Sequence, residues 1–144
     1  MRRITWFIGL AVMVLSCEVK PQEINFGADG CHFCKMTIVD TRHAAQLVTE
    51  KGKAFKYDAI ECMLNDLADW DEVPVKFYLV VDYSNPKQFV DARESYYLIS
   101  PAIPSPMGAN ISAFSNAQLR NEMLAAIGGE ALNWESINAQ FNRK

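Results

Sequence analysis

Residues 58–82 have the sequence DAIECMLNDLADWDEVPVKFYLVVD, which predicts a helix followed by a buried strand. Asp58-Ala59-Ile60-Glu61 is typical of a capping box, and apolar residues follow it at the spacing of one helical face. Pro74 lies beyond the predicted end of this helix. Lys76–Asp82 is then a nearly continuous apolar run, which indicates a strand buried on both faces. The apolar helical positions are Ile60, Met63, Leu64 and Leu67.

Strand-like segments precede this helix. Met36–Val39 is β-branched and apolar, while Ala45–Thr49 and Lys53–Tyr57 flank a Lys51-Gly52 turn. Together with the helix and the buried strand, they predict a ββαβ unit over residues 27–84.

The same order of elements recurs over residues 85–144. Ser115-Asn116-Ala117-Gln118 resembles a second capping box, Phe114 and Leu119 occupy its hydrophobic staple, and Gly128-Gly129 ends the predicted helix. We therefore expect an α+β fold of two related ββαβ halves packed together. The predicted strands are Lys87–Ala92, Ser95–Ser100, Ile111–Phe114 and Ala131–Trp134, and the predicted buried helical stripe is Leu119, Met123, Ala126 and Ile127.

The N-terminus has the layout of a secretory signal peptide. A basic start, Met1-Arg2-Arg3, precedes the apolar run 4–15. That run is too short to cross a bilayer, which needs about 20 apolar residues in a helix. Val14-Leu15-Ser16-Cys17 resembles the lipobox of bacterial lipoproteins, in which the cysteine is acylated. We therefore expect a signal peptide over residues 1–16.

Lipidation of Cys17 would make residues 17–26 a tether that holds the protein on the periplasmic side of the envelope. Glu18 follows the cysteine, which favours the inner leaflet of the outer membrane in a host that has one. The alternative is ordinary cleavage that leaves Cys17 as a plain thiol.

The charge of the mature chain excludes one class of function. Removing residues 1–16 takes away Arg2 and Arg3 and no acid, so the formal net charge falls from −3 to −5. Nucleic-acid binding requires a basic patch, and basic clusters are absent from this sequence. We expect no nucleic-acid partner.

Sulfur-containing residues are concentrated in Gly30-Cys31-His32-Phe33-Cys34-Lys35-Met36. Two thiols and a thioether within six residues form a soft-ligand cluster, and soft ligands select copper(I). If the chain is extended from Cys34, then Cys34 and Met36 project to the same side. Met107 is a further candidate, because Pro104, Pro106 and Gly108 make a helix improbable there and hold it on a stiff loop.

Other interpretations of these residues exist. Cys31 and Cys34 in an exported protein are also compatible with a structural disulfide. A thioredoxin-like redox pair is disfavoured because β-branched residues follow the two cysteines. Haem attachment is disfavoured because the sequence has Lys35 where that motif requires a His. A closed zinc site would need two more ligands. His32 and His43 are expected at the surface. Cys62 is expected to be a small packing residue of the helix.

Three motifs together resemble the NosL family, the accessory lipoproteins of nitrous oxide reductase. They are Gly27–Met36, Asp91-Ala92-Arg93 followed by Tyr96-Tyr97-Leu98, and Ser105-Pro106-Met107-Gly108. The resemblance implies a periplasmic copper(I) chaperone that supplies nitrous oxide reductase or its assembly machinery. It also implies a fold similar to the core of organomercurial lyase. The implied copper ligands are Cys31, Cys34, Met36 and Met107.

Three classes of function follow from these observations. The favoured one is a metal carrier without enzymatic activity. The second is a thiol enzyme, either a disulfide exchanger or a relative of organomercurial lyase in its chemistry. The third is a structural envelope lipoprotein with a Cys31–Cys34 disulfide.

Overall fold

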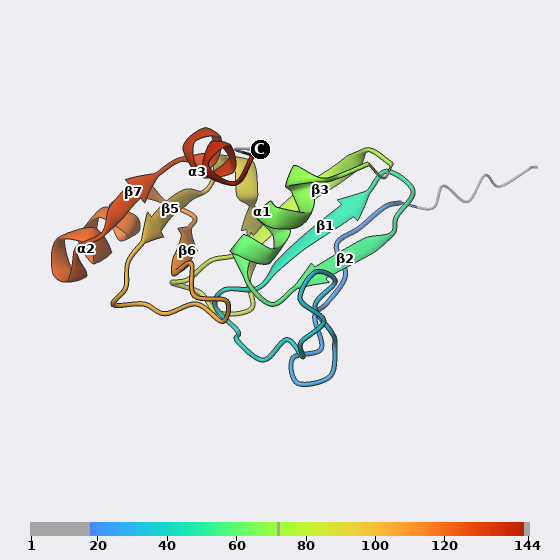
Figure 1. The fold of residues 1–144 in the computed structure, drawn as a ribbon, viewed down its shortest axis with the longest axis horizontal. Coiled ribbons are helices and arrows are strands. Elements are labelled where there is room, and N and C mark those ends of the chain that lie inside the picture. The colour runs from blue at the N-terminus through green and yellow to red at the C-terminus, as the bar shows by residue number, and fades with distance from the viewer. Residues whose placement is uncertain (1–17, 72, 143–144) are drawn as a thin grey trace, which may run out of the picture.

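The computed structural model describes residues 18–71 and 73–142, which form two antiparallel sheets with helices packed against them (Figure 1). The predicted signal peptide and Cys17 lie outside the described residues. Within the described ranges, no helix has the length and apolar character needed to cross a membrane.

The first sheet and its helix form the predicted ββαβ unit. Its first strand is central, and the strand after the helix pairs on the other side, which gives the order β2-β1-β3-β4. The strand β4 (Phe89–Asp91) lies beyond residue 84 in the chain, yet it extends this sheet by pairing with β3. The elements of the unit are β1 (Ala45–Thr49), β2 (Ala54–Tyr57), α1 (Ile60–Ala68) and β3 (Val75–Val81).

The second unit repeats this topology. Its sheet has the order β6-β5-β7, so the first strand is again central and antiparallel to both neighbours. The prediction of two related ββαβ halves is therefore confirmed at the level of topology, whereas a likeness to organomercurial lyase stays a prediction. The elements are β5 (Tyr96–Ile99), β6 (Ile111–Phe114), α2 (Ala117–Ile127) and β7 (Glu130–Leu132).

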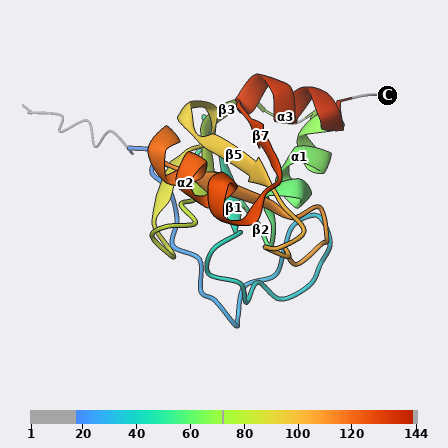
Figure 2. The same ribbon diagram turned by 90° about the vertical axis from the view of Figure 1, so that its left-hand side faces the viewer.

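Two helical segments were not expected. A short 3-10 helix, Ala92–Glu94, joins β4 to β5, and α3 (Trp134–Phe141) follows β7. The strand predicted over Ala131–Trp134 is wrong at its end, because the Asn133 side chain accepts a hydrogen bond from the Ser136 amide at 2.9 Å and starts α3. Figure 2 shows α3 lying beside α1, so this helix covers the first unit as well as the second.

The two units share the larger of two buried clusters. A single cluster of buried residues includes Leu47, Met63, Tyr97 and Ile137 from both units. The backbones also meet, since the Tyr83 amide donates to the Ala113 carbonyl at 2.8 Å. Side chains far apart in the sequence can therefore hold fixed positions relative to one another.

His43 is buried at this junction, so its expected surface position is wrong. Its side chain is 3% exposed, Nδ1 lies 3.0 Å from Asp40 Oδ2, and Nε2 lies 3.3 Å from Ser112 Oγ. Ser112 belongs to β6, and the two polar partners compensate for burying the imidazole. His32, in contrast, is exposed as expected.

Met36–Val39 is not a strand. Lys35 has a φ of 65°, which turns the chain, and only Thr37 of this stretch pairs, in an isolated bridge with Gly30. The same turn removes the extended geometry expected to place Cys34 and Met36 on one side.

Both predicted helix caps lie one residue too early. The N-cap of α1 is Ala59, without a side-chain hydrogen bond, and the N-cap of α2 is Asn116, whose side chain accepts from the Leu119 amide. Glu61 was expected to complete the first capping box. Its carboxylate instead receives hydrogen bonds from the loop before β6.

The predicted buried stripe of α2 is also wrong. All residues of α2 are described and none is buried: Met123 and Ile127 are half-buried, whereas Leu119 and Ala126 are exposed. The helix packs on a sheet of three short strands, which covers little of it. Gly129 follows the helix with a φ of +130°, and a Cβ there would lie 2.3 Å from the Ile99 carbonyl oxygen.

Candidate metal centre

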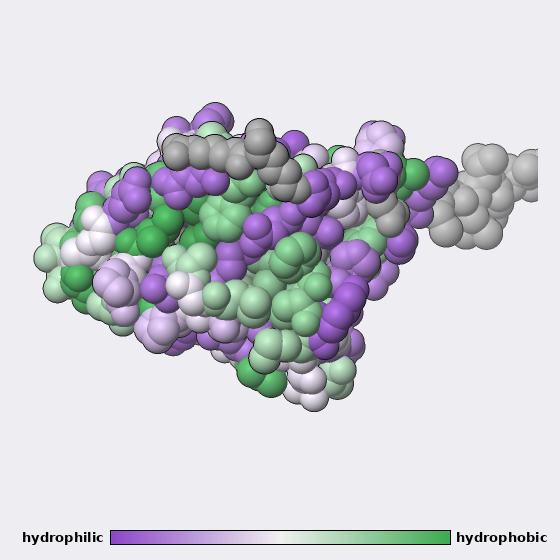
Figure 3. All heavy atoms as spheres, viewed as in Figure 1, coloured by the Kyte–Doolittle hydropathy of each residue, from purple (hydrophilic) through white to green (hydrophobic). Residues whose placement is uncertain are grey.

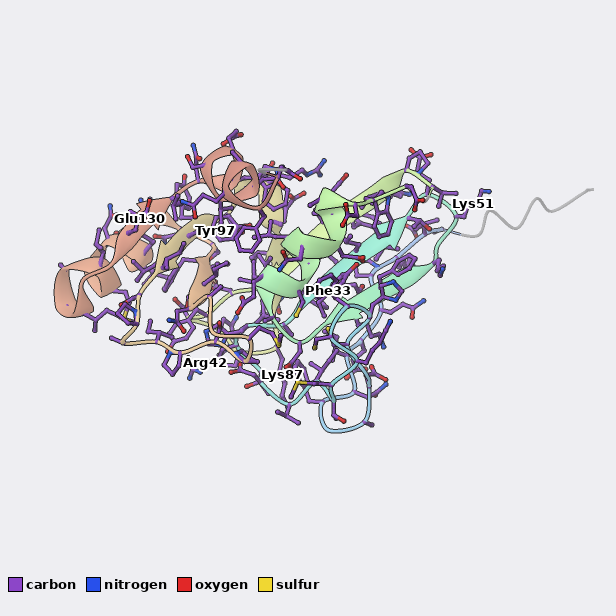
Figure 4. The ribbon with its side chains drawn as sticks, in the orientation of Figure 1. Phe33, Arg42, Lys51, Lys87, Tyr97 and Glu130 are labelled. Carbon is purple, nitrogen blue, oxygen red and sulfur yellow. The ribbon has the colours of Figure 1, made fainter. Side chains whose placement is uncertain are left out.

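Three cysteines meet at the start of α1. The sulfur atoms of Cys31, Cys34 and Cys62 all lie within 4.8 Å of one another. All three are free thiols, and Cys31 and Cys62 are buried at 2% and 1% exposure while Cys34 is half-buried. Figure 4 shows sulfur atoms gathered below the first turn of α1, close to the labelled Phe33. We refer to these three residues as the thiol cluster.

A closed turn presents the first two cysteines. The Cys31 amide donates to the Met36 carbonyl at 2.7 Å, and the Lys35 amide donates to the Cys31 carbonyl at 3.1 Å. A further bond from the His32 amide to the Lys56 carbonyl, 2.7 Å long, fixes the turn to β2. The loop is therefore ordered by its own backbone.

Cys62 comes from α1 and completes the thiol cluster. Sequence reasoning assigned it to packing, because helical spacing places it behind the cap but cannot show that the loop of Cys31 folds over that turn. The repeat gives no hint either, since Leu119 takes the third position of α2 and is exposed. The signal in the sequence that could have indicated a role for Cys62 in the site was the presence of a third cysteine beside the Cys31-x-x-Cys34 pair.

The thiol cluster has an uneven distribution of protons. A hydrogen bond from the Cys62 thiol lowers the pKa of Cys31, with help from the backbone amides of Asp58 and Cys34. The same bond raises the pKa of Cys62, and burial raises the pKa of Cys34. Within the thiol cluster, Cys31 is therefore the thiol that loses its proton most readily.

The spacing of the sulfur atoms suits one soft ion. A metal–thiolate bond is about 2.3 Å long, so sulfurs around a trigonal ion lie about 4.0 Å apart and those of a linear pair about 4.6 Å apart. With all three sulfurs within 4.8 Å of one another, small side-chain movements are enough to bind. The thiol cluster can hold an ion by two or by three sulfur donors.

The two predicted methionine ligands are largely exposed. Met36 is 56% exposed and Met107 44%. The Met36 backbone is bonded to Cys31, and the loop of Met107 is bonded to Glu61, the neighbour of Cys62. Both thioethers thus belong to segments attached to the thiol cluster, while their participation in metal binding stays a prediction.

Exposed apolar side chains are concentrated on the same segments. Four of the six large hydrophobic residues exposed within the described ranges are Phe33, Met36, Val39 and Met107. Figure 3 shows apolar residues gathered on the face below α1. These side chains are exposed apolar surface on the segment that follows Cys31 and on the Met107 loop.

Two acidic side chains, the buried Asp58 and the half-buried Asp66, lie near the thiol cluster. Asp58, at 1% exposure, has Oδ1 buried without a hydrogen-bond partner among the described residues, and burial raises its pKa. The Tyr57 hydroxyl donates to Asp66 Oδ2 at 2.6 Å, and His32 Nε2 lies 3.9 Å from the same oxygen. None of these side chains was predicted as part of the site.

Comparisons with known proteins agree on one family. The sequence profile of the NosL family matches residues 22–141. The chain is 24% identical over 123 residues to the copper-binding lipoprotein NosL of Stutzerimonas stutzeri, a match that covers 77% of this chain and 63% of that protein. The chain thus spans less than two thirds of this relative's length.

A solved structure has the same fold. It is the crystal structure of the copper chaperone NosL from Shewanella denitrificans, with a TM-score of 0.71 and 22% sequence identity. The similarity covers 82% of this chain and 95% of that one.

Proposed function

Because the chain belongs to the NosL family, we propose that it is a copper(I) carrier that delivers the ion to nitrous oxide reductase at the periplasmic side of the envelope. The observation that carries this proposal is the thiol cluster, with three sulfurs within 4.8 Å of one another. The names of the relatives from Stutzerimonas and Shewanella support copper as the cargo.

The donor set favours copper(I) over zinc. Zinc in a structural site takes four ligands in a tetrahedron, whereas the thiol cluster supplies three sulfurs. Copper(I) is soft and accepts low coordination numbers with thiolate and thioether donors. We propose Cys31, Cys34 and Cys62 as thiol ligands, with Met36 and Met107 as exposed thioether donors.

The exposure of the donors supports transfer of metal rather than thiol catalysis. A nucleophilic cysteine needs an accessible thiolate, yet Cys31, the cysteine of the thiol cluster whose pKa is lowered, is 2% exposed. The thioethers of Met36 and Met107 are the sulfur atoms that an acceptor protein can approach. Copper can therefore pass outward by exchange of one ligand at a time.

A competition titration tests the copper site. The reduced chain is titrated with copper(I) against a chromophoric chelator, beside Cys34→Ser and Met107→Leu variants. We expect one tightly bound ion per chain, a large loss of affinity for Cys34→Ser because a hydroxyl is a poor ligand for a soft ion, and a smaller loss for Met107→Leu. Binding by Cys34→Ser equal to that of the parent chain contradicts the proposed site.

A transfer assay tests the partner. Copper-loaded protein is mixed with copper-free nitrous oxide reductase, and the two are separated and analysed for metal. We expect the copper to move to the reductase. If the copper stays on the carrier while a chelator of similar affinity removes it, the proposed acceptor is wrong.

The anchor is tested separately. We propose lipidation of Cys17, so Cys17→Ala should move the protein from the membrane fraction to the soluble periplasm or leave an uncleaved precursor. A cleaved Cys17→Ala protein that stays in the membrane fraction contradicts a lipid on this residue.

A further inference from the structure

Glu61 is a buried carboxylate next to Cys62, in the first turn of α1. It is 3% exposed. Its Oε1 accepts one hydrogen bond from the Ser105 hydroxyl and another, 3.2 Å long, from the Ala109 amide. Burying a carboxylate is unfavourable unless such bonds compensate for lost water. Because burying this carboxylate is costly, we expect the contact that it makes between α1 and the loop before β6 to serve a function.

The loop that Glu61 holds has a shape of its own. The Asn110 amide donates to Ser105 Oγ at 2.8 Å, and the Ser105 amide donates to Asn110 Oδ1 at 3.2 Å. Gly108 and Asn110 have positive φ values of 84° and 59°. These contacts close residues 105–110 into a compact turn with Met107 near its tip. Glu61 is therefore not needed to form the turn, only to attach it to α1.

The two sides of this contact carry different kinds of sulfur. On the α1 side, Glu61 is followed in the chain by Cys62 of the thiol cluster. On the loop side, Met107 lies between Ser105 and Ala109, the two residues bonded to Glu61. One carboxylate oxygen thus joins the thiol-bearing segment of the first unit to the thioether-bearing loop of the second.

We propose that Glu61 is a positioning residue for copper(I) binding, which fixes the Met107 loop against α1 so that the thioether is held beside the thiol cluster. This inference rests on the proposed function, with Met107 as a ligand. A ligand held in place before binding gives higher affinity than one that must be ordered by the metal. Outer contacts of this kind alter metal affinity by roughly 10- to 100-fold in other sites.

The test is a double-mutant cycle on copper(I) affinity in the full chain purified in detergent. Glu61→Ala removes the acceptor, and it should weaken binding about tenfold, by the lower end of that range. Glu61→Gln keeps a side-chain carbonyl at the same reach and should restore most of the affinity. In a Met107→Leu background, Glu61→Ala should have no further effect, because the thioether that it positions is gone.

Ser105→Ala is the second variant, needed if Glu61→Ala does not fold. It removes the hydroxyl that donates to Glu61 and accepts from the Asn110 amide, it leaves α1 intact, and it should lower copper affinity only when Met107 is present. Circular dichroism and thermal unfolding of each copper-free variant establish that it is folded before affinity is compared.

Three results overturn the inference. Equal losses from Glu61→Ala with and without Met107 mean that the carboxylate supports the fold or the thiols and not the thioether. Unchanged affinity of both Glu61→Ala and Ser105→Ala means that the loop needs no attachment. Unchanged affinity of Met107→Leu removes the ligand that Glu61 is proposed to position, while Cys34→Ser separately decides whether the thiols bind copper.

Discussion

Replacing Cys62 by Ala separates metal binding from packing. In the copper-free protein, the change removes one buried heavy atom, which costs about 1 kcal/mol. It also removes the thiol that donates to Cys31, and a hydrogen bond of this kind contributes about 1 kcal/mol. We therefore expect the free energy of unfolding to fall by about 2 kcal/mol.

That loss is too small to affect copper binding through the fold. A domain with about 5 kcal/mol of stability keeps about 3 kcal/mol, so roughly 1% of the chains unfold. Loss of one of three thiol donors should instead lower copper(I) affinity by at least about 100-fold, the upper end of the range for losing an outer contact, which is equivalent to about 2.7 kcal/mol. The two effects differ enough to be measured independently.

The assays are urea unfolding of the copper-free protein and chelator competition for copper(I). Ile137→Val, in the buried face of α3, is the matched control for packing, because it also removes one buried heavy atom at a cost of about 1 kcal/mol and lies on no segment of the thiol cluster. It should lose stability and keep its affinity. If Cys62→Ala binds copper as tightly as Ile137→Val does, Cys62 is not a ligand and the three-sulfur site is refuted.

Three further predictions concern charge and stability. Because the pKa of Cys31 is lowered, its thiolate contributes stability that is fully present above the ordinary thiol pKa of 9.0 and is lost as pH falls through the lowered value. Ultraviolet thiolate absorbance should therefore appear well below pH 9.0 in the copper-free protein and move to higher pH in Cys62→Ala. A titration that begins only near pH 9.0 contradicts the assignment. Gly129→Ala should lower the free energy of unfolding by at least about 2 kcal/mol, given its positive φ and the close carbonyl, whereas Gly30→Ala, with open space at its Cβ, should change it little in the same urea experiment. His43→Ala should cost about 2–4 kcal/mol by leaving a cavity and two unpaired polar groups, and a change within experimental error in thermal unfolding counts against its bridging role.

The sequence predicted most strands because their composition is decisive. Ala45–Thr49 and Ile111–Phe114 are short and bounded by turn residues, and both form strands at those limits. The helix α3 was missed because the predicted last strand was extended to Trp134, although Trp134, Ile137 and Phe141 recur at the spacing of one helical face. Thr37 and Ile38 favour a strand by propensity, but hydrogen bonds of the Cys31 turn override that preference.

Two of the three cysteines of the thiol cluster were predicted, because they are close together in the sequence. Cys31 and Cys34 are close in sequence, so spacing alone indicated that their sulfurs could meet. Cys62, Glu61 and His43 act through partners 28 to 69 residues away, and periodicity describes only the face of an element and not what covers it. Long-range contacts of this kind require knowledge of how loops, helices and strands are packed together in space.

The backbone bonds of the Cys31–Met36 turn have a consequence for the speed of copper delivery. The order of the turn does not depend on a metal, because the bonds of the Cys31, Lys35 and His32 amides join backbone groups and leave the sulfur atoms out. Release therefore needs no preceding unfolding of the loop, and the activation barrier arises from exchange of sulfur ligands in the encounter complex. The observed transfer rate should consequently rise in proportion to acceptor concentration, without an early plateau set by a slow opening step.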